Sequence, residues 1–336
     1  MNILVTGGAG YVGSHTAKLL AESGHDVWVY DNLSTGHAGA ALPGRLITGD
    51  LHDGELLRYV LGGRKIEAVM HFAASSLVGE SVANPAKYYR NNLVATLSLL
   101  EAMRDCDVSR IVFSSTAATY GTPGAMPIRE DTPQVPCNPY GVTKLAIERA
   151  LGDYANAYRW GFAALRYFNA AGAAADGTLG EDHTPESHLI PIVLQVALGQ
   201  RQHITVFGDD YPTPDGTCVR DYVHVDDLAS AHLAALEHLQ PGEGLKMNLG
   251  TGRGYSVREV IDTCREVTGC EISEVAGPRR AGDPPELVAD PSLAMETLGW
   301  QPQHTTVESI VETAWRWHQA NPQGYDAVAV EEVAVV

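Results

Sequence analysis

Continuous apolar runs alternate with helix-like segments through the first half of the chain. Each run is short and shows no polar alternation, which is the pattern of a strand buried on both faces. The apolar runs are Ile3–Val5, Val27–Tyr30, Ala68–Phe72, Ile111–Phe113 and Phe162–Leu165, and the predicted helices cover residues 11–22, 53–61, 85–104 and 139–158. Strands that alternate with helices in this way predict an α/β fold with a doubly wound parallel sheet of the Rossmann type.

The pattern changes beyond about residue 170. Residues 170–186 are rich in Ala, Gly and Asp, and residues 209–216 contain two prolines, so both segments are predicted loops. Helical patterns resume at residues 188–199, 226–238, 257–268, 291–298 and 306–319. We therefore expect a first domain over residues 1–170 and a smaller C-terminal α/β region over residues 171–325. Residues 326–336 show no such pattern and are predicted to be a disordered tail.

The charge of the chain excludes several classes of partner. Its 336 residues include 41 acidic residues against 23 lysines and arginines, a formal net charge of -18. Such a field repels nucleic acid and anionic lipid, and no apolar stretch approaches the roughly 18 residues that a membrane span needs. Because Met1-Asn2-Ile3 enters the first strand at once, we expect no signal peptide and a cytoplasmic protein. An anionic ligand would need helix N-termini and a few arginines.

Cysteine and histidine positions give no sign of a disulfide or a metal site. The five cysteines are widely spaced and form no C-x-x-C pair. His183 and His188 lie on either side of Pro185, in a predicted loop rather than on one helix face. We therefore expect no metal.

A glycine-rich segment follows the first strand and opens the first helix. Residues 7–13, Gly-Gly-Ala-Gly-Tyr-Val-Gly, would let the backbone approach a pyrophosphate at the positive end of that helix. A plain strand–helix turn is the alternative. The second strand ends in Asp31, where an acid would bond to ribose hydroxyls and repel a 2′-phosphate. These features predict NAD rather than NADP, with the Gly49-Asp50-Leu51 corner near the adenine, unless Asp50 is only a turn residue.

A second signal is the sequence Tyr140-Gly141-Val142-Thr143-Lys144. This spacing places a phenol and an ammonium one helical turn apart on the same face. The ammonium and an oxidised nicotinamide would both lower the pKa of the phenol, so that Tyr140 could act as a base. Thr116, at the end of the preceding strand, could share the substrate proton. The alternative is an exposed helix start with a surface lysine.

These motifs, together with several others, resemble one family. The others are Asp31-Asn32-Leu33, Gly49-Asp50, His71–Ala74, Val78–Ser81, Tyr88-Tyr89, Asn91-Asn92, Phe113–Thr116, Leu165–Asn169, Val219–Val225 and Pro278–Asp283. From residue 1 to about residue 325 the chain resembles the UDP-glucose 4-epimerases of the extended short-chain dehydrogenase/reductase superfamily. The resemblance implies reversible 4-epimerisation of UDP-glucose and UDP-galactose, in galactose metabolism, through a 4-keto intermediate and tightly bound NAD.

The resemblance also implies the catalytic and cofactor-binding residues. Tyr140 would be the base, Lys144 would hold the nicotinamide ribose and tune Tyr140, and Thr116 would bond to the sugar hydroxyl. Residues 1–170 would bind NAD. The cofactor-binding residues would be Gly7, Gly10, Tyr11, Val12, Gly13, Asp31, Asn32, Asp50, Leu51, Phe72, Ala73, Ala74, Asn91, Ser114, Tyr140, Lys144 and Tyr167.

The region over residues 171–325 would bind the UDP-sugar. The substrate-binding residues would be Thr116, Tyr140, Phe168, Asn169, His188, Leu189, Thr205, Val206, Phe207, Arg220, Arg280, Asp283 and Leu287. Asn169, Arg220 and Arg280 would meet the pyrophosphate, with a surface salt bridge as the alternative for Arg280. Phe207 would lie by the uracil and Asp283 by the uridine ribose.

The family pattern extends to the way the two regions are connected and assembled. Lys246–Gly250 would return to the N-terminal sheet, so that part of residues 225–250 belongs to the first domain. The resemblance further suggests a homodimer that packs through the helices near residues 85–104 and 139–158.

The chain departs from several relatives at two positions, and a third position bears on the choice of sugar. Ser76 stands where several relatives have a lysine near the cofactor ribose, and His188 where some have an asparagine near the sugar diphosphate. Both departures concern binding more than the reaction. Leu287 occupies the position that limits room around the C2 substituent of the sugar.

Other functions were weighed against this one. A 4,6-dehydratase needs an acid pair after the hydroxyl residue and a UDP-glucuronate decarboxylase a glutamate, whereas Ala117-Ala118-Thr119 follow Thr116. A non-catalytic NAD-sensing protein would have lost the Tyr140 and Lys144 pair, which is intact. A 4-epimerase of another UDP-sugar, UDP-N-acetylglucosamine or a UDP-pentose, stays open.

Overall fold

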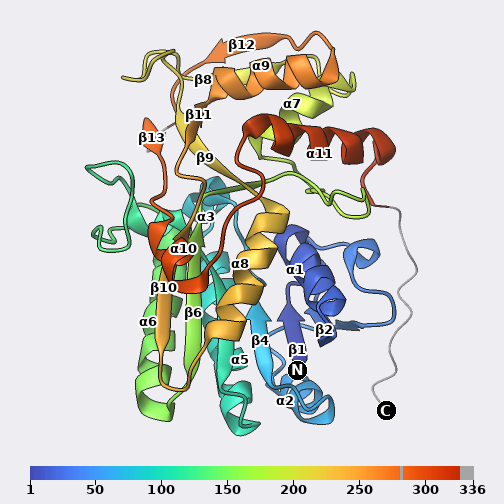
Figure 1. Cartoon of the computed structure of the whole chain (residues 1–336), viewed down its shortest axis with the longest axis vertical. Coiled ribbons are helices and arrows are strands. Elements are labelled where there is room, and N and C mark those ends of the chain that lie inside the picture. The colour runs from blue at the N-terminus through green and yellow to red at the C-terminus, as the bar shows by residue number, and fades with distance from the viewer. Residues whose placement is uncertain (281–282, 326–336) are drawn as a thin grey trace.

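A seven-stranded parallel sheet forms the lower part of the computed structural model, which describes residues 1–280 and 283–325 (Figure 1). In spatial order its strands are β10 (Gly244–Leu249), β6 (Gly161–Tyr167), β5 (Arg110–Thr116), β4 (Ala68–His71), β1 (Asn2–Thr6), β2 (Asp26–Asp31) and β3 (Leu46–Thr48). All neighbours are parallel, so the carboxyl ends of the strands share one edge. The strand order reverses between β1 and β4, which is where such sheets bind ligands.

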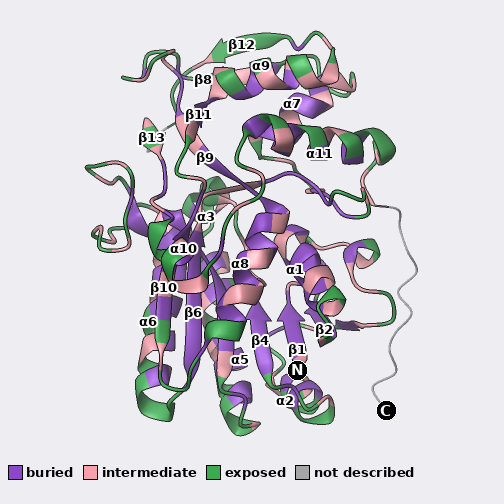
Figure 2. Ribbon diagram, viewed as in Figure 1, coloured by how far each residue is buried: buried purple, intermediate pink, exposed green. Residues whose placement is uncertain are grey.

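Helices cover both faces of this sheet. They are α1 (Tyr11–Glu22), α8 (Val225–His238) and α10 (Ser292–Leu298) on one face, and α2 (Gly54–Gly63), α5 (Ala95–Asp105) and α6 (Pro139–Tyr158) on the other. Leu20 and Leu228 belong to the core on the first face, and Leu57 and Leu99 to the core on the second. Because both faces are covered, the strands are buried along nearly their whole length (Figure 2), which explains their uninterrupted apolar runs. The doubly wound α/β prediction is confirmed.

The segment that was expected to be one helix over residues 85–104 is more complex. After the short α3 (Val78–Ala83), it consists of α4 (Pro85–Tyr88), a π-helical segment η2 (Tyr89–Val94) and then α5. In the wider π-helical turn, the buried amide of Asn92 bonds to Ser75 and to Thr143 of α6. A π-helical turn leaves no signature in the hydrophobic period, and such turns are frequent at functional sites.

The upper region holds two small sheets and three helices. One sheet contains β7 (Asn169–Ala171), β9 (Val219–His224), β11 (Gly254–Ser256) and β13 (Glu286–Leu287), and the other β8 (Ile204–Phe207) and β12 (Glu274–Gly277). The helices α7 (Leu189–Ala197), α9 (Val257–Thr268) and α11 (Val307–Ala320) share a separate core with them. The predicted loop over residues 170–186 therefore starts later than expected, because Ala170 and Ala171 pair with β9.

After β6 the chain enters the upper region and returns to the lower one twice, first as α8 and β10 and later as α10. After β9, α8 packs against α1, and β10 then lies beside β6 with Met247 opposite Leu165. Within the described residues, no helix is both long and apolar enough to cross a bilayer. The predicted tail over residues 326–336 lies outside the described residues.

Candidate active site

The glycine-rich turn joins β1 to α1 at the carboxyl edge of the sheet. Gly7 has φ +73°, and a Cβ there would lie 2.5 Å from the backbone nitrogen of Ala73. A Cβ on Gly13 would lie 2.2 Å from the carbonyl oxygen of Gly7. Only glycines allow this approach, which leaves the first N–H groups of α1, at Tyr11 and Val12, facing outward with no helical acceptor. The turn therefore fits a dinucleotide pyrophosphate.

The side chains of Tyr11 and Val12 make structural contacts and do not face the turn. The Tyr11 hydroxyl donates to the carbonyl of Gly172 at 2.6 Å, and Val12 packs against the core between α1 and the sheet. Their predicted part in cofactor binding therefore falls to their backbone N–H groups.

Acidic side chains gather at the ends of β2 and β3. The buried Asp31 carboxylate accepts hydrogen bonds from the backbone of Ala9 at 3.0 Å and of Leu33 at 2.8 Å. Burial raises the pKa of Asp31, and these two hydrogen bonds oppose the rise. Asn32 donates to Asp50 at 2.9 Å, so these predicted residues converge at one corner. The Leu51 side chain instead packs into the core beneath them.

The segment after β4 closes the other side of the turn. Phe72 and Ala73 donate to the carbonyl of Thr6 at 2.9 and 3.1 Å, and Ala74 follows, half-buried. Asn91, the predicted contact, donates only to the Ser75 hydroxyl at 3.2 Å. Its neighbour Asn92 is fully buried and holds both backbone groups of Ser75. Sequence reasoning missed the positioning role of Asn92, which the motif alone does not distinguish from Asn91.

The predicted catalytic residues come together at the carboxyl end of β5. Asn138 caps α6 by accepting from the backbone of Gly141 at 2.9 Å, which starts the helix just before Tyr140. The Lys144 ammonium donates to the carbonyl of Ser114 at 2.7 Å and lies 5.8 Å from the centre of the Tyr140 ring. The Thr116 hydroxyl lies close enough to Tyr140 to lower the pKa of its phenol. Base, ammonium and hydroxyl therefore share one site.

Tyr167 completes this group from β6. Its hydroxyl is 2.6 Å from the Ser114 side chain, so that two predicted cofactor contacts bond to each other.

The buried positions of Tyr140 and Lys144 shift the pKa of both groups. Burial raises the pKa of the Tyr140 phenol, Tyr167 raises it further, and Thr116 lowers it. Burial also lowers the pKa of Lys144 to about 7, against an upward effect of Glu148. In the protein alone, burial therefore outweighs the lowering of the Tyr140 pKa by Thr116. The lowering expected from Lys144 and an oxidised nicotinamide together stays a prediction.

A buried polar network supports α6 from below. Arg166 on β6 donates to both carboxylate oxygens of Glu148, at 2.9 and 2.6 Å. Ser115 donates to the same carboxylate at 2.5 Å, and Arg166 also reaches the Tyr120 hydroxyl at 2.8 Å. Glu148 lies one helical turn after Lys144, so the network fixes the helix that carries the catalytic pair. Nothing in the sequence distinguishes Glu148 from an ordinary surface glutamate.

The predicted substrate residues lie around β8, β9 and β13. Arg220 forms an ion pair with Asp283, and the Arg280 guanidinium lies 4.2 Å from the centre of the Phe207 ring. Leu287 is paired with Arg220 across β13 and β9. This arrangement brings two arginines, a carboxylate and an exposed ring to one wall.

Of the remaining residues that were predicted to bind substrate, some are half-buried near the site and others pack into the upper core. Phe168 and Asn169 leave the carboxyl end of β6, half-buried, and Thr205 is half-buried on β8. The Val206 side chain is buried in the upper core, and Leu189 packs against that core from the start of α7. The Val206 side chain is therefore not free to contact a sugar, whereas the predicted contact of the partly buried Leu189 stays a prediction.

Histidines 183 and 188 lie close together in the loop before α7. Both pair with the buried Glu181, and His183 is also 3.6 Å from Glu186. Burial would lower the pKa of His183, but the two glutamates raise it to about 10. Burial likewise would raise the pKa of Glu181, but the two histidines lower it to about 2. Both histidines lie in a loop, as predicted, and this loop brings them together at Glu181, which the spacing alone did not indicate.

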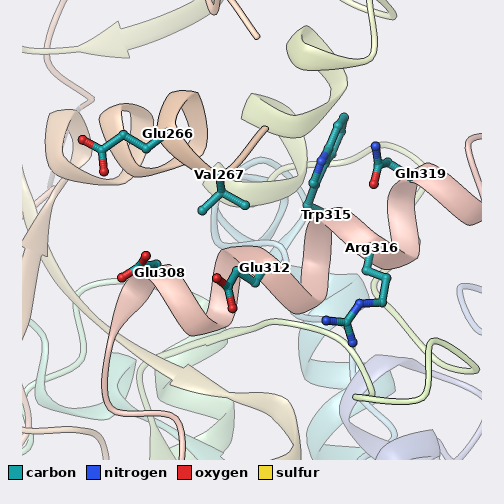
Figure 3. A pocket seen from close by; sticks show the side chains of 7 residues that line it. All are labelled: Glu266, Val267, Glu308, Glu312, Trp315, Arg316 and Gln319. Carbon is teal, nitrogen blue, oxygen red and sulfur yellow. The ribbon is translucent and has the colours of Figure 1, made fainter. Parts of the chain in front are cut away.

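A groove on the upper region lies away from these residues. It runs between α9 and α11, and none of the predicted site residues lines it (Figure 3). Its lining residues are Glu266, Val267, Glu308, Glu312, Trp315, Arg316 and Gln319. The groove is therefore separate from the candidate active site.

Comparison with known proteins places this geometry in a family. Residues 3–250 match the model described as the NAD dependent epimerase/dehydratase family. A UDP-glucose 4-epimerase of Halalkalibacterium halodurans is 55% identical over 97% of this chain and 98% of that protein. Among solved structures, a UDP-glucose 4-epimerase from Brucella ovis in complex with NAD is 52% identical, with a TM-score of 0.90, over 94% of this chain and 97% of that chain.

A second solved structure carries ligands for both halves of the site. It is the UDP-glucose 4-epimerase from Bifidobacterium longum in complex with NAD+ and UDP, 42% identical with a TM-score of 0.92. The match covers 97% of this chain and 100% of that chain. The three proteins named above, which match this chain over nearly its whole length, are UDP-glucose 4-epimerases, and the chain itself belongs to the NAD dependent epimerase/dehydratase family.

Proposed function

We propose that this chain interconverts UDP-glucose and UDP-galactose by 4-epimerisation with bound NAD. The observation that carries the proposal is the group of Tyr140, Thr116 and Lys144 at the sheet edge where the glycine-rich turn also lies. Full-length relatives that bear this activity in their names support it. Fold alone would not, because one fold hosts many reactions.

The residues of the first domain would hold the cofactor and the reacting proton. The turn at Gly7–Gly13 would bind the pyrophosphate and Asp31 the adenosine ribose. Tyr140 would remove the proton from O4 of the sugar while Thr116 bonds to the same oxygen, and Lys144 would hold the nicotinamide ribose. When bound, NAD supplies the hydride acceptor for C4 and a positive charge that favours the Tyr140 phenolate. The 4-keto sugar would then rotate in the site, so that C4 regains its hydride on the opposite face and O4 regains its proton.

The upper region would hold the nucleotide of the substrate. Arg220 and Arg280 are the cations that a diphosphate needs in a chain of net charge -18. Asp283 would bond to the uridine ribose and Phe207 would stack by the uracil. Holding the UDP while the sugar turns is what this reaction requires of the site.

Assembly and location are further parts of the proposal. We infer a homodimer packed through the helices at residues 85–104 and 139–158, where Tyr89, Val94 and Tyr158 are exposed apolar side chains. A cytoplasmic location is part of the same proposal. The boundary between the cofactor domain and the substrate region is placed near residue 170.

Product analysis tests the function directly. Incubation with UDP-galactose and no added cofactor should yield UDP-glucose, because the hydride returns to the same substrate. Tyr140→Phe should lower turnover by about 10²–10⁴-fold and leave UDP binding unchanged, since it removes the proton acceptor and keeps the ring. Tyr59→Phe, which changes an exposed tyrosine of α2 outside the proposed interface, is the control and should keep the wild-type rate. Dependence on a steady supply of free NAD would contradict the closed cycle.

A further inference from the structure

Four metal-ligand side chains meet in the loop between β7 and α7. They are Glu181, His183, Glu186 and His188, here called the His-Glu cluster, and their ligand atoms all lie within 4.8 Å of one another. The Glu181 and Glu186 side chains are 3% and 4% exposed, and those of His183 and His188 are 29% and 47% exposed. The two carboxylates are therefore buried, and the two imidazoles are accessible from solvent.

The distances within the cluster suit a small ion. Nδ1 of His183 is 3.3 Å from Oε1 of Glu181 and 3.6 Å from Oε2 of Glu186, and Nδ1 of His188 also contacts Glu181. The two imidazole rings are 5.3 Å apart and nearly perpendicular, at 84°. Ligands at zinc distances, tetrahedrally placed, are about 3.4 Å apart. The ligand atoms of the cluster, all within 4.8 Å of one another, are close to this spacing.

Neighbouring groups already orient these ligands. Oε1 of Glu186 accepts from the backbone of Ser187 at 2.6 Å and of His188 at 2.8 Å, which leaves Oε2 turned toward His183. The Tyr11 ring packs edge-on against His183 at 6.2 Å, and its hydroxyl is fixed by Gly172. Outer partners of this kind hold metal ligands in place.

The charge of the cluster and the type of its ligand atoms limit which metal ions it can bind. The glutamates raise the pKa of His183, so a metal ion must displace protons from the imidazoles to solvent as it binds. Two carboxylates and two deprotonated imidazoles then carry a charge of -2, which one divalent cation cancels. Imidazole nitrogen favours zinc and its first-row neighbours, whereas magnesium and calcium prefer oxygen alone. We propose that the His-Glu cluster binds one divalent transition-metal ion of the zinc class and thereby ties the loop before α7 to the start of that helix.

Metal titration of the intact protein tests the site. After treatment with a chelator, the protein should bind one Zn²⁺ per chain and melt at a higher temperature. Co²⁺ should give a visible d–d spectrum without a thiolate charge-transfer band, which distinguishes this site from the five cysteines. His183→Gln should weaken Zn²⁺ binding at least about 10-fold. His203→Gln, which changes an exposed histidine outside the cluster, should bind as the wild type does.

His188→Asn provides a second variant, because its half-exposed side chain can change without disturbing the core. It should weaken Zn²⁺ binding as His183→Gln does, with an unchanged circular dichroism spectrum. Equal affinity of the wild type and both variants would overturn the proposal. So would a thiolate band, or no Zn²⁺ bound by the wild type.

Discussion

Leu287 is the single side chain that we expect to set sugar specificity in the proposed site. It lies on β13 opposite Arg220 and is half-buried. Since the resemblance places it beside the C2 substituent of the sugar, we expect UDP-glucose and UDP-galactose to be preferred over N-acetylated sugars. Leu287→Ala should raise kcat/KM for UDP-N-acetylglucosamine by about 10-fold and change that for UDP-galactose little.

A matched control separates this effect from a general loss of packing. Leu293→Ala removes the same atoms from an exposed leucine of α10 and should change kcat/KM for neither substrate. Equal efficiency of the unmutated enzyme on both sugar types would show that Leu287 is not a gate.

Lys144 makes the stability of the protein depend on pH. Burial lowers its pKa from 10.5 to about 7, so between these values the unfolded chain binds more protons than the folded one. The free energy of unfolding should therefore gain a contribution that rises with pH over this window, by at most about 1.4 kcal/mol per pH unit. Urea unfolding at pH 7 and pH 9 measures it.

The comparison needs two variants. In Lys144→Met, the free energy of unfolding should no longer rise between pH 7 and pH 9. In Lys65→Met, which removes an exposed lysine, the rise should remain. An identical pH dependence in all three proteins would mean that Lys144 has an ordinary pKa when folded.

Local spacing predicted some residues of the site and not others. Tyr140 and Lys144 could be paired because a helix places residues four apart on one face. The convergence of His183 and His188 on Glu181 depends on the path of an irregular loop, for which no periodic rule exists. Asn92 was equally hidden, because a π-helical turn decides which of two adjacent asparagines points inward.

At the scale of elements, the ion pair of Glu148 and Arg166 joins α6 to the sheet. The Glu148 side chain is 0% exposed and that of Arg166 2% exposed. Glu148→Gln would leave the buried guanidinium without its counter-charge, so we expect a loss of about 3–5 kcal/mol in the free energy of unfolding. The exposed pair Arg58 and Asp105 is the control, and Asp105→Asn should cost less than about 1 kcal/mol. Equal losses measured by urea denaturation would contradict the prediction.

The elements themselves were predictable because burial imposes its period on the sequence. The five inner strands of the large sheet, β6, β5, β4, β1 and β2, are covered on both faces and leave continuous apolar runs, whereas β10 and β3 at its two edges do not. The short strands β7 and β13 carry too few residues for a period, and both went unpredicted. Their pairing with β9 is set by the tertiary structure rather than by local preference.

For the whole molecule, the return of the chain to the first sheet determines what can fold alone. A fragment of residues 1–170 would lack β10 at the edge of the sheet and α8 over α1, which exposes apolar residues such as Leu20 and Leu165. We expect this fragment to be insoluble or to melt without a cooperative transition. A chain that ends at residue 325 keeps every described element and should melt as the full chain does.

Circular dichroism and soluble yield decide between these outcomes. A cooperative transition in the 1–170 fragment would show that β10 and α8 are dispensable to the first domain.

The position of β10 also bears on synthesis. About 80 residues of chain separate β6 from β10, its neighbour in the sheet. At a ribosomal rate of ~5–20 residues per second, this interval lasts about 4–16 s. During that time the strands up to β6 have been made, and the outer edge of β6 offers unpaired N–H and C=O groups to any other extended chain. The nascent protein is therefore most exposed to aggregation midway through its own translation, and chaperones would be needed at that stage rather than at its end.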